Sequence, residues 1–246
     1  MTSHRSSDFT ADGHLNLIRL FIDAALTSPA IKSVTPTELD GAYSSIERYY
    51  TGKLETYGAT PRGVDWESLA TQEMRFVQLV RVCDFSESFS LNDLGCGYGA
   101  LLALLFKRHN ATTIDYLGVD LSKAMVLAAR KRWIKAAQAR FVVGRECPRV
   151  ADYSVASGIF NVQLNQSLDI WTEIVERTLR QLHESSRVAF SVNFLAQLPL
   201  GHNCAPELYC AAPKQWIDFC RQTLEARVEL CDDYGMQEFT LHVYRS

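Results

Sequence analysis

Hydrophobic and polar positions follow two different periods along this chain, and the change comes near residue 85. Before that point, apolar residues recur at helical spacing, which predicts helices over residues 15–26, 35–49 and 66–82. After it, short apolar segments alternate with amphipathic ones. Strands are expected at 89–94, 114–119, 140–143, 153–158, 186–194, 226–232 and 238–244, and helices at 99–109, 122–138, 168–183 and 213–224.

The first part of the chain therefore contains helices and loops without a predicted strand. Thr35 and Glu38 have the spacing of a capping box, so the second helix is expected to begin there. Glycines and prolines interrupt the pattern from Gly52 onward, and Asp65 is expected to cap the third helix. We expect residues 1–85 to form an N-terminal helical cap and residues 86–246 to form a sheet domain.

The second part indicates an α/β fold. Alternating strands and helices favour a parallel sheet with helices on both faces. The last two strands are separated by residues 233–237 alone, which is too short for a crossover, so the final strand must run antiparallel. The expected sheet has seven strands, is mostly parallel, and ends in a reversed hairpin strand.

A glycine-rich turn follows the first of these strands. The sequence DLGCGYG places Asp93 at the strand end and three glycines before a helix. Glycines let the backbone turn sharply and let a ligand approach it, and the helix N-terminus beyond offers free N–H groups. The second strand ends in Asp120, where an acid can accept hydrogen bonds from both hydroxyls of a ribose. The two features together indicate a site for a nucleoside-containing ligand.

These residues resemble motif I of the class I S-adenosylmethionine (SAM)-dependent methyltransferases, which reads Asp-Leu-Gly-Cys-Gly-x-Gly. The third glycine comes one position earlier than in the G-x-G-x-x-G fingerprint of NAD-binding folds. The resemblance covers about residues 85–246 and implies a Rossmann-like fold with a reversed last strand. It also implies that SAM is the cofactor. The residues that would bind it are Asp93, Gly95, Cys96, Gly97, Gly99, Asp120 and Leu121.

The segment after the third strand departs from the family pattern. Arg145 stands where the family usually carries an acid that meets the adenine amino group, and Glu146 follows it. Two candidates could bind the adenine amino group instead: Glu146, shifted by one residue, or a backbone group. The alternative for Glu146 is an ordinary surface acid.

Strand ends supply further candidates, because loops at the carboxyl ends of strands build the site in this kind of fold. Phe160 and Asn161 follow the fourth strand, Asn193 ends the fifth, and His202 lies in the next loop. Phe160 is expected to pack near the cofactor. The two amides are candidates for orienting cofactor or substrate, or they are structural caps. His202 is a candidate general base, or an ordinary surface histidine.

Residues 49–58 are aromatic and glycine-rich, and they precede the sheet domain. Tyr49, Tyr50 and Tyr57 are candidate lid residues whose rings attract a sulfonium cation, or they simply pack the front helices. Candidate partners for the carboxylate of the cofactor are Lys53, Gln72 and Arg75.

Composition narrows the class of partner. The net charge of −3 gives no pull toward nucleic acid or an anionic membrane, and no apolar run is long enough to span a bilayer. The seven cysteines have no metal-binding spacing, so most are expected to be reduced thiols in a cytoplasmic protein. The expected partner is a small molecule, with no nucleic acid, membrane or metal, and the oligomeric state is left open.

Three functions are compatible with this reading. The leading one is methyl transfer from SAM to an oxygen or nitrogen nucleophile of a small molecule by in-line displacement. The second is a SAM cyclase or lyase of the same fold, which forms azetidine-2-carboxylate and methylthioadenosine from SAM alone. The third is a non-catalytic partner protein that keeps the fold, although its expected sign is a decayed glycine motif and this one is intact.

Overall fold

The structure, a computed structural model, describes residues 34–110, 112–197 and 204–245. Residues Val34–Ser246 form one compact unit, so the described cap helices belong to the same unit as the sheet. The helix expected at 15–26 and the candidate base His202 lie outside the described residues.

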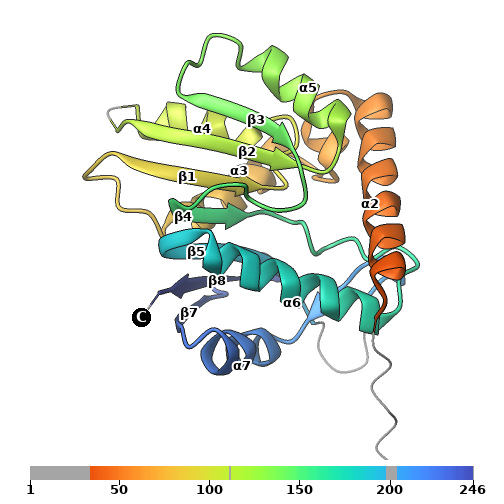
Figure 1. Cartoon of the computed structure of the whole chain (residues 1–246). Coiled ribbons are helices and arrows are strands. Elements are labelled where there is room, and N and C mark those ends of the chain that lie inside the picture. Colours follow the sequence, from red (N-terminus) through yellow and green to blue (C-terminus); the bar gives the residue numbers. More distant parts are fainter. Residues whose placement is uncertain (1–33, 111, 198–203, 246) are drawn as a thin grey trace, which may run out of the picture. The chain divides into compact units, whose positions relative to one another are not determined.

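An eight-stranded sheet forms the centre of the described unit (Figure 1). Its strand order is β3-β2-β1-β4-β5-β8-β7, with the short β6 also paired to β5. β8 runs antiparallel to β5 and to β7, while the other pairings are parallel, which confirms the reversed last strand. The strands are β1 (Phe89–Leu94), β2 (Ile114–Asp120), β3 (Ala139–Val143), β4 (Ala151–Ala156), β5 (Ser186–Ala196), β6 (Cys210–Ala211), β7 (Arg227–Cys231) and β8 (Glu238–Tyr244).

Helices cover both faces of the sheet, as expected. One apolar layer packs α3, α4 and α5 against the sheet, and the other packs α6 and α7 against the opposite face (Figure 1). The helical elements are α2 (Pro36–Tyr57), the 3-10 turn η1 (Pro61–Val64), α3 (Leu69–Val80), α4 (Ala100–Arg108), α5 (Lys123–Arg132), α6 (Leu168–Glu184) and α7 (Pro213–Thr223).

The cap departs from the predicted boundaries in two places. The capping box at Thr35 is present, but α2 continues through Gly52 to Tyr57 and ends at Gly58. The local cost of a helical glycine is about 1 kcal/mol, and tertiary packing of the buried face of α2 outweighs it. The N-cap residue of helix α3 is Ser68, whose side chain accepts a hydrogen bond from the backbone N–H of Thr71. The prediction that Asp65 caps this helix was therefore wrong.

The long helix α2 crosses the carboxyl ends of the strands. Figure 1 shows the arrows of β1, β2 and β3 pointing toward it. Its buried residues Leu39, Ala42 and Ile46 join the same apolar cluster as Leu94 and Phe160, which lie at and just beyond strand ends. The cap is therefore packed onto the edge of the sheet where the predicted site residues gather.

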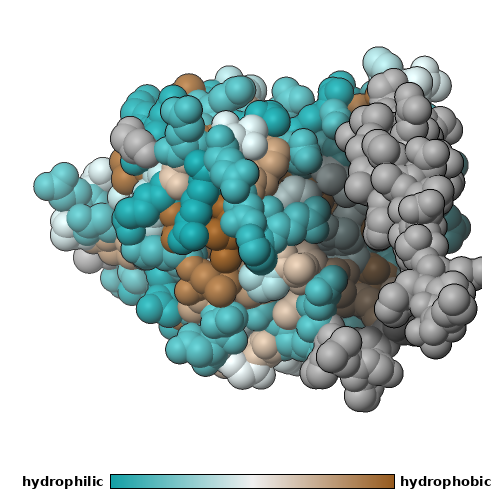
Figure 2. All heavy atoms as spheres, turned by 90° about the horizontal axis from the view of Figure 1, so that it is seen from below, coloured by the Kyte–Doolittle hydropathy of each residue, from teal (hydrophilic) through white to brown (hydrophobic). Residues whose placement is uncertain are grey.

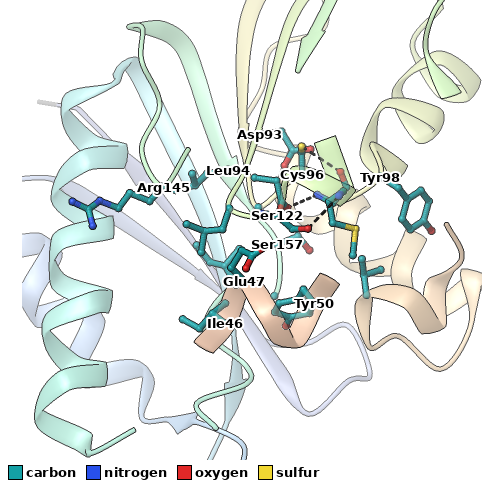
Figure 3. A pocket seen from close by; sticks show the side chains of 18 of the residues that line it. Ile46, Glu47, Tyr50, Asp93, Leu94, Cys96, Tyr98, Ser122, Arg145 and Ser157 are labelled. Atoms are coloured by element: carbon teal, nitrogen blue, oxygen red, sulfur yellow. Dashed lines mark hydrogen bonds between the residues drawn. The ribbon is translucent and has the colours of Figure 1, made fainter. Parts of the chain in front are cut away.

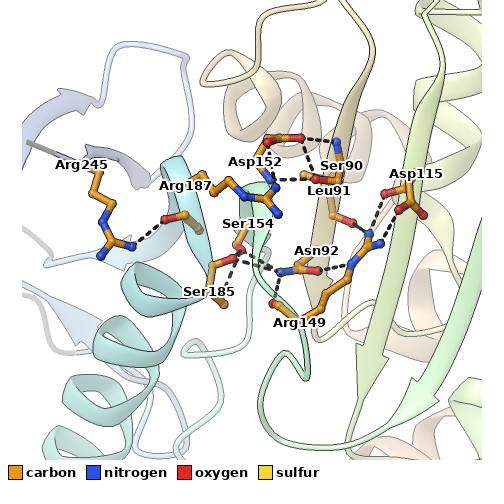
Figure 4. Close-up of polar contacts among 11 residues, drawn as sticks. Ser90, Leu91, Asn92, Asp115, Arg149, Asp152, Ser154, Ser185, Arg187 and Arg245 are labelled. Atoms are coloured by element: carbon orange, nitrogen blue, oxygen red, sulfur yellow. Dashed lines mark hydrogen bonds and ion pairs between the residues drawn. The ribbon is translucent and has the colours of Figure 1, made fainter.

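Arg149, in the loop before β4, lies at the centre of a polar network that joins three neighbouring strands (Figure 4). Arg149 donates from Nε to Asn92 Oδ1 (3.1 Å) and from Nη2 to the backbone oxygens of Leu91 (3.2 Å) and Asp115 (2.7 Å). The Asn92 amide in turn donates to Ser154 Oγ at 3.2 Å. Because these groups satisfy one another, the network joins β1, β2 and β4 without leaving buried polar atoms of Asn92 unpaired.

The cysteines confirm the sequence-based expectation only in part. Five of them are free and buried. Cys204 and Cys210 form a disulfide that the sequence did not predict. The pairing of β6 with β5 places Cys210, and the turn before it brings the Cys204 Cα within 6.2 Å of the Cys210 Cα.

The surface seen from below is mostly hydrophilic and includes a small area of hydrophobic side chains (Figure 2). Among the described helices, none is both long enough and apolar enough to cross a membrane.

Candidate functional site

A pocket lies where the cap meets the carboxyl ends of β1, β2 and β4, with an empty volume of ≈ 1060 Å³ that includes space open to solvent. α2, η1 and α3 supply one wall, and the turns after the strands supply the other (Figure 3). The predicted site residues that line it are Tyr50, Gln72, Asp93, Gly95, Cys96, Gly97, Asp120, Leu121 and Phe160. Those that do not line it are Tyr49, Lys53, Tyr57, Arg75, Gly99, Glu146, Asn161 and Asn193.

Asp120 is fixed in the pocket by two backbone amides. Its Oδ2 accepts a hydrogen bond from Gly97 N and its Oδ1 accepts one from Ser122 N, each at 2.8 Å. Gly97 has φ +53°, a conformation that glycine adopts at no steric cost and that aims its N–H at the acid. Burial raises the pKa of Asp120 to about 6, although these two hydrogen bonds act in the opposite direction.

Asp93 lies deeper, at the end of β1, and is almost fully buried. It accepts a hydrogen bond from the Tyr116 hydroxyl. Burial raises its pKa to about 7, and the nearby charge of Asp120 acts in the same direction. Burying two carboxyl groups in one pocket is costly for stability. Groups with strongly raised pKa values are concentrated at functional sites, so these two acids indicate one.

Gly99 has a packing role in this structure. A Cβ atom added to it would lie 2.6 Å from Trp133 Nε1, and that nitrogen donates to the Gly99 carbonyl at 2.9 Å. The third glycine of the motif thus makes room for a tryptophan beside the turn, while Gly95 and Gly97 line the pocket.

The turn after β4 is held by the amide of Asn193. Gly158 N donates to Asn193 Oδ1 at 2.8 Å, and Asn193 Nδ2 donates to Glu238 Oε2 at 3.1 Å. Both ends of this amide are therefore in use within the protein. Asn161 is 6% exposed, and its Oδ1 accepts no hydrogen bond among the described residues. Phe160 lines the pocket and stacks on Phe194, with ring centroids 5.0 Å apart.

Two of the three expected carboxylate partners are already paired. Arg75 forms an ion pair with Glu238, with Nε 2.6 Å from Oε2 and Nη2 2.5 Å from Oε1. Lys53 pairs with Asp65 at 2.6 Å. Gln72 lines the pocket and accepts a hydrogen bond from the Tyr98 hydroxyl at 3.3 Å. Of the three, Gln72 is the one that faces the pocket.

The three lid tyrosines separate in the same way. Tyr50 lines the pocket. The ring of Tyr49 packs edge-on against the ring of Tyr50, with the two centroids 5.2 Å apart. Tyr57 is exposed. The ammonium of Lys53 lies over the rings of Tyr49 (5.2 Å) and Tyr57 (5.7 Å), so these two rings already face a cation of the protein.

The cap also touches both turns of the sheet. A Cβ on Gly97 would lie 3.1 Å from Val64, and a Cβ on Gly158 would lie 2.5 Å from Trp66. Residues 61–66 therefore rest directly on the two turns that line the pocket.

Several pocket residues were not predicted from the sequence. Ser157 follows β4, and its hydroxyl is buried without a hydrogen bond among the described residues. Tyr43, Ile46 and Glu47 also line the pocket, and with the predicted Tyr50 they recur at three- and four-residue steps along α2, a spacing that puts them on one face of a helix. This helical spacing in the sequence could have identified the pocket-lining face of α2, but it does not indicate what that face packs against.

Comparison with known proteins supports one family. A methyltransferase-domain family model matches residues 92–187. A protein of Mycobacterium tuberculosis strain H37Rv, named "Putative methyltransferase Rv1506c", is 44% identical over 168 residues, which are 68% of this chain and 99% of that protein. The chain belongs to the class I SAM-dependent methyltransferases.

Solved structures agree with this methyltransferase fold. The magnesium protoporphyrin IX methyltransferase ChlM of Synechocystis PCC 6803 aligns with a TM-score of 0.58 and 15% identity over 83% of this chain and all of that one. The pyocyanin biosynthetic protein PhzM aligns with a TM-score of 0.56 and 13% identity over 96% of this chain and 85% of that one.

The pocket of this methyltransferase fits its cofactor, SAM. SAM carries a ribose diol and a cationic sulfonium. Asp120 offers an acceptor held by two amides, and the orphaned hydroxyl of Ser157 offers a further polar contact in the pocket wall. Acidic and aromatic side chains in one pocket suit a cation.

Proposed function

We propose that this protein transfers the methyl group of SAM to an oxygen or nitrogen atom of a small, largely uncharged acceptor by in-line displacement. The observation that supports this most is the composition of the pocket. Beyond the residues assigned to the cofactor, its walls carry bulky apolar and aromatic side chains, namely Val64, Trp66, Phe76 and Ile159. A concave, mostly apolar site of this kind suits a small molecule better than a nucleic acid.

The chain would act mainly by binding and alignment. Asp120 accepts hydrogen bonds from the ribose, the Gly95–Gly97 turn lets the cofactor approach the backbone, and Gln72 offers its amide hydrogens to the carboxylate. When bound, SAM supplies a methyl group already activated by a positive sulfur. Positioning alone accounts for a large share of the rate when the nucleophile is held in line.

A strong base is needed only for a poor nucleophile such as an alcohol. The amide of Asn193 is fully engaged within the protein, so we assign it a positioning role at the Gly158 turn. The side-chain oxygen of Asn161 accepts no hydrogen bond from the described residues, and we propose it as a contact to the acceptor or to the cofactor amine. The role of His202 as a base remains a proposal.

Product analysis with radiolabelled SAM tests this function. Incubation with a panel of phenols and amines is expected to give S-adenosylhomocysteine and a labelled acceptor, with unreacted SAM when no acceptor is added. Methylthioadenosine formed from SAM alone would overturn methyl transfer and support the cyclase alternative. Failure of the protein to bind SAM at all would overturn both. Asp120→Ala, which removes the proposed ribose acceptor, serves as the inactive control.

A further inference from the structure

We infer that Glu47 of α2 is a second acid of the adenosine site, a hydrogen-bond acceptor that the cap supplies in place of the acid expected after β3. The inference rests on the proposed binding of the cofactor ribose at Asp120. It concerns which residue of this chain reads the donor groups of the adenosine half, namely the ribose hydroxyls and the adenine amine.

The loop after β3 presents no carboxylate to the pocket. Gly144 and Arg145 line it, whereas Glu146 is exposed and does not. Arg145 forms an ion pair with Asp40 at 2.8 Å, and Figure 3 shows its side chain pointing away from the other labelled residues. The position that the family usually gives to an adenine-binding acid is therefore filled here by a base that turns outward.

Glu47 reaches the same pocket from the other side. It lines the pocket together with Tyr43 and Tyr50, one turn before and one turn after it on α2. Neighbouring Ile46 is buried in the core, so packing fixes the rotation of the helix about its axis. Figure 3 labels Glu47, Ser122 and Ser157 among the side chains that line the pocket.

A series of hydrogen bonds connects Glu47 to Asp120, the acid proposed to bind the ribose. Thr51 Oγ1 donates to Glu47 Oε1 at 3.0 Å and lies 2.7 Å from Ser122 Oγ. Because a hydroxyl has one hydrogen, Thr51 must accept from Ser122. The backbone N–H of Ser122 donates to Asp120. The hydrogen bond from Thr51 thus orients Oε1 of Glu47, and Oε2 accepts no hydrogen bond from any described residue.

The two acids are close enough to interact. The charge of Glu47 contributes to raising the pKa of Asp120. Ionised carboxylates accept hydrogen bonds and donate none, so a pair of them selects ligand groups that donate. The ribose hydroxyls and the adenine amine are such groups, and the positive charge of SAM lowers the cost of holding two anions in one pocket.

Calorimetric titration of S-adenosylhomocysteine tests the inference without relying on turnover. Glu47→Ala is expected to weaken binding about tenfold or more, the loss typical of a hydrogen bond to a charged group. Glu55→Ala, an exposed acid on the same helix, is the matched control and should bind like the wild type. A Glu47→Ala protein that binds as tightly as the control would overturn the inference.

Two analogues identify the contacted group, one lacking the adenine amine and one lacking the ribose 2′-hydroxyl. The wild type should bind one of them less tightly than the parent ligand, and Glu47→Ala should lose that particular preference. If Glu47→Ala weakens all three ligands by the same factor, Glu47 contacts neither group and the inference is overturned. If the wild type binds none of them, the proposed function itself fails.

Discussion

At the scale of single residues, the pocket depends on two acids, of which Asp93 is buried and Asp120 is partly buried. Asp120 is held by the amides of Gly97 and Ser122, and these bonds lower the pKa that burial raises. A carboxyl group with a pKa of about 6 changes its charge within an accessible range of pH. Once protonated, one of its oxygens becomes a donor and no longer accepts from a ribose hydroxyl.

Cofactor affinity should therefore depend on pH. Binding of S-adenosylhomocysteine, which carries no sulfonium charge, is expected to weaken as pH falls through about 6, because the protonated fraction of Asp120 grows. Asp120→Asn should bind weakly at every pH and lose this dependence. Calorimetry at several pH values measures both, and a wild-type affinity that stays constant through that range would contradict the assignment.

His242 gives a second pH effect, on stability and with a known sign. Its Nδ1 lies 3.0 Å from Ser191 Oγ, and burial lowers its pKa to about 4, with the charge of Arg81 acting in the same direction and that of Glu229 against it. Below its unfolded pKa of about 6.5, the unfolded chain takes up a proton that the folded chain resists. Stability should fall as pH drops from that value toward about 4.

His242→Gln removes this titration and keeps a polar side chain near Ser191. Urea unfolding of the wild type and the variant over the acidic range isolates the effect of His242, since Asp93 and Asp120 titrate in both proteins. The raised pKa values of Asp93 and Asp120 increase stability as pH falls, because the folded state holds protons that the unfolded state releases. Equal pH slopes in the two proteins would contradict the role of His242.

At the scale of elements, the cap is tied to the sheet by a buried ion pair. The guanidinium of Arg75 on α3 meets Glu238 on β8 and lies over the ring of Trp66, 3.9 Å from its centroid. Glu238 also accepts from Asn193, which holds the Gly158 turn. The pair therefore links the cap, the reversed strand and a turn of the pocket through side chains that are 10% and 1% exposed.

Breaking this pair on one side should be costly. Arg75→Met is expected to lower the free energy of unfolding by about 3–5 kcal/mol, because it leaves the buried Glu238 charge unpaired. The double variant with Glu238→Leu should recover part of that loss. Lys107→Met removes the exposed pair between Lys107 on α4 and Glu73, which lies on α3 like Arg75, and should cost less than about 1 kcal/mol. Urea unfolding gives all three values, and a double variant no more stable than Arg75→Met would contradict the argument.

At the scale of the whole molecule, sequence reasoning succeeded where the signal is local. The glycine turn, the strand ending in Asp120 and the reversed hairpin follow from patterns within a few dozen residues. The roles of Arg75 and Lys53 could not be predicted, because their partners are fixed by folding; Glu238 lies 163 positions from Arg75. Gly52 was misjudged for the same reason, since the packing that keeps it helical is tertiary.

Because the cap and the sheet both line the pocket, a bound cofactor should stabilise them together. S-adenosylhomocysteine at 100 times its Kd is expected to raise the free energy of unfolding by about 2.7 kcal/mol. Hydrogen exchange should slow in α2 and in residues 61–66 as well as in the turns of the sheet. Protection confined to residues 93–99 and 157–160 would contradict a pocket closed by the cap.

The contact of residues 61–66 with both turns also bears on the speed of the enzyme. Val64 and Trp66 lie against Gly97 and Gly158, and we predict that the spent cofactor leaves past this segment and that the segment must move to release it. Turnover would then be timed by departure of product instead of by methyl transfer. Steady-state rates should fall as solvent viscosity rises, while the first turnover of a preloaded enzyme keeps its rate.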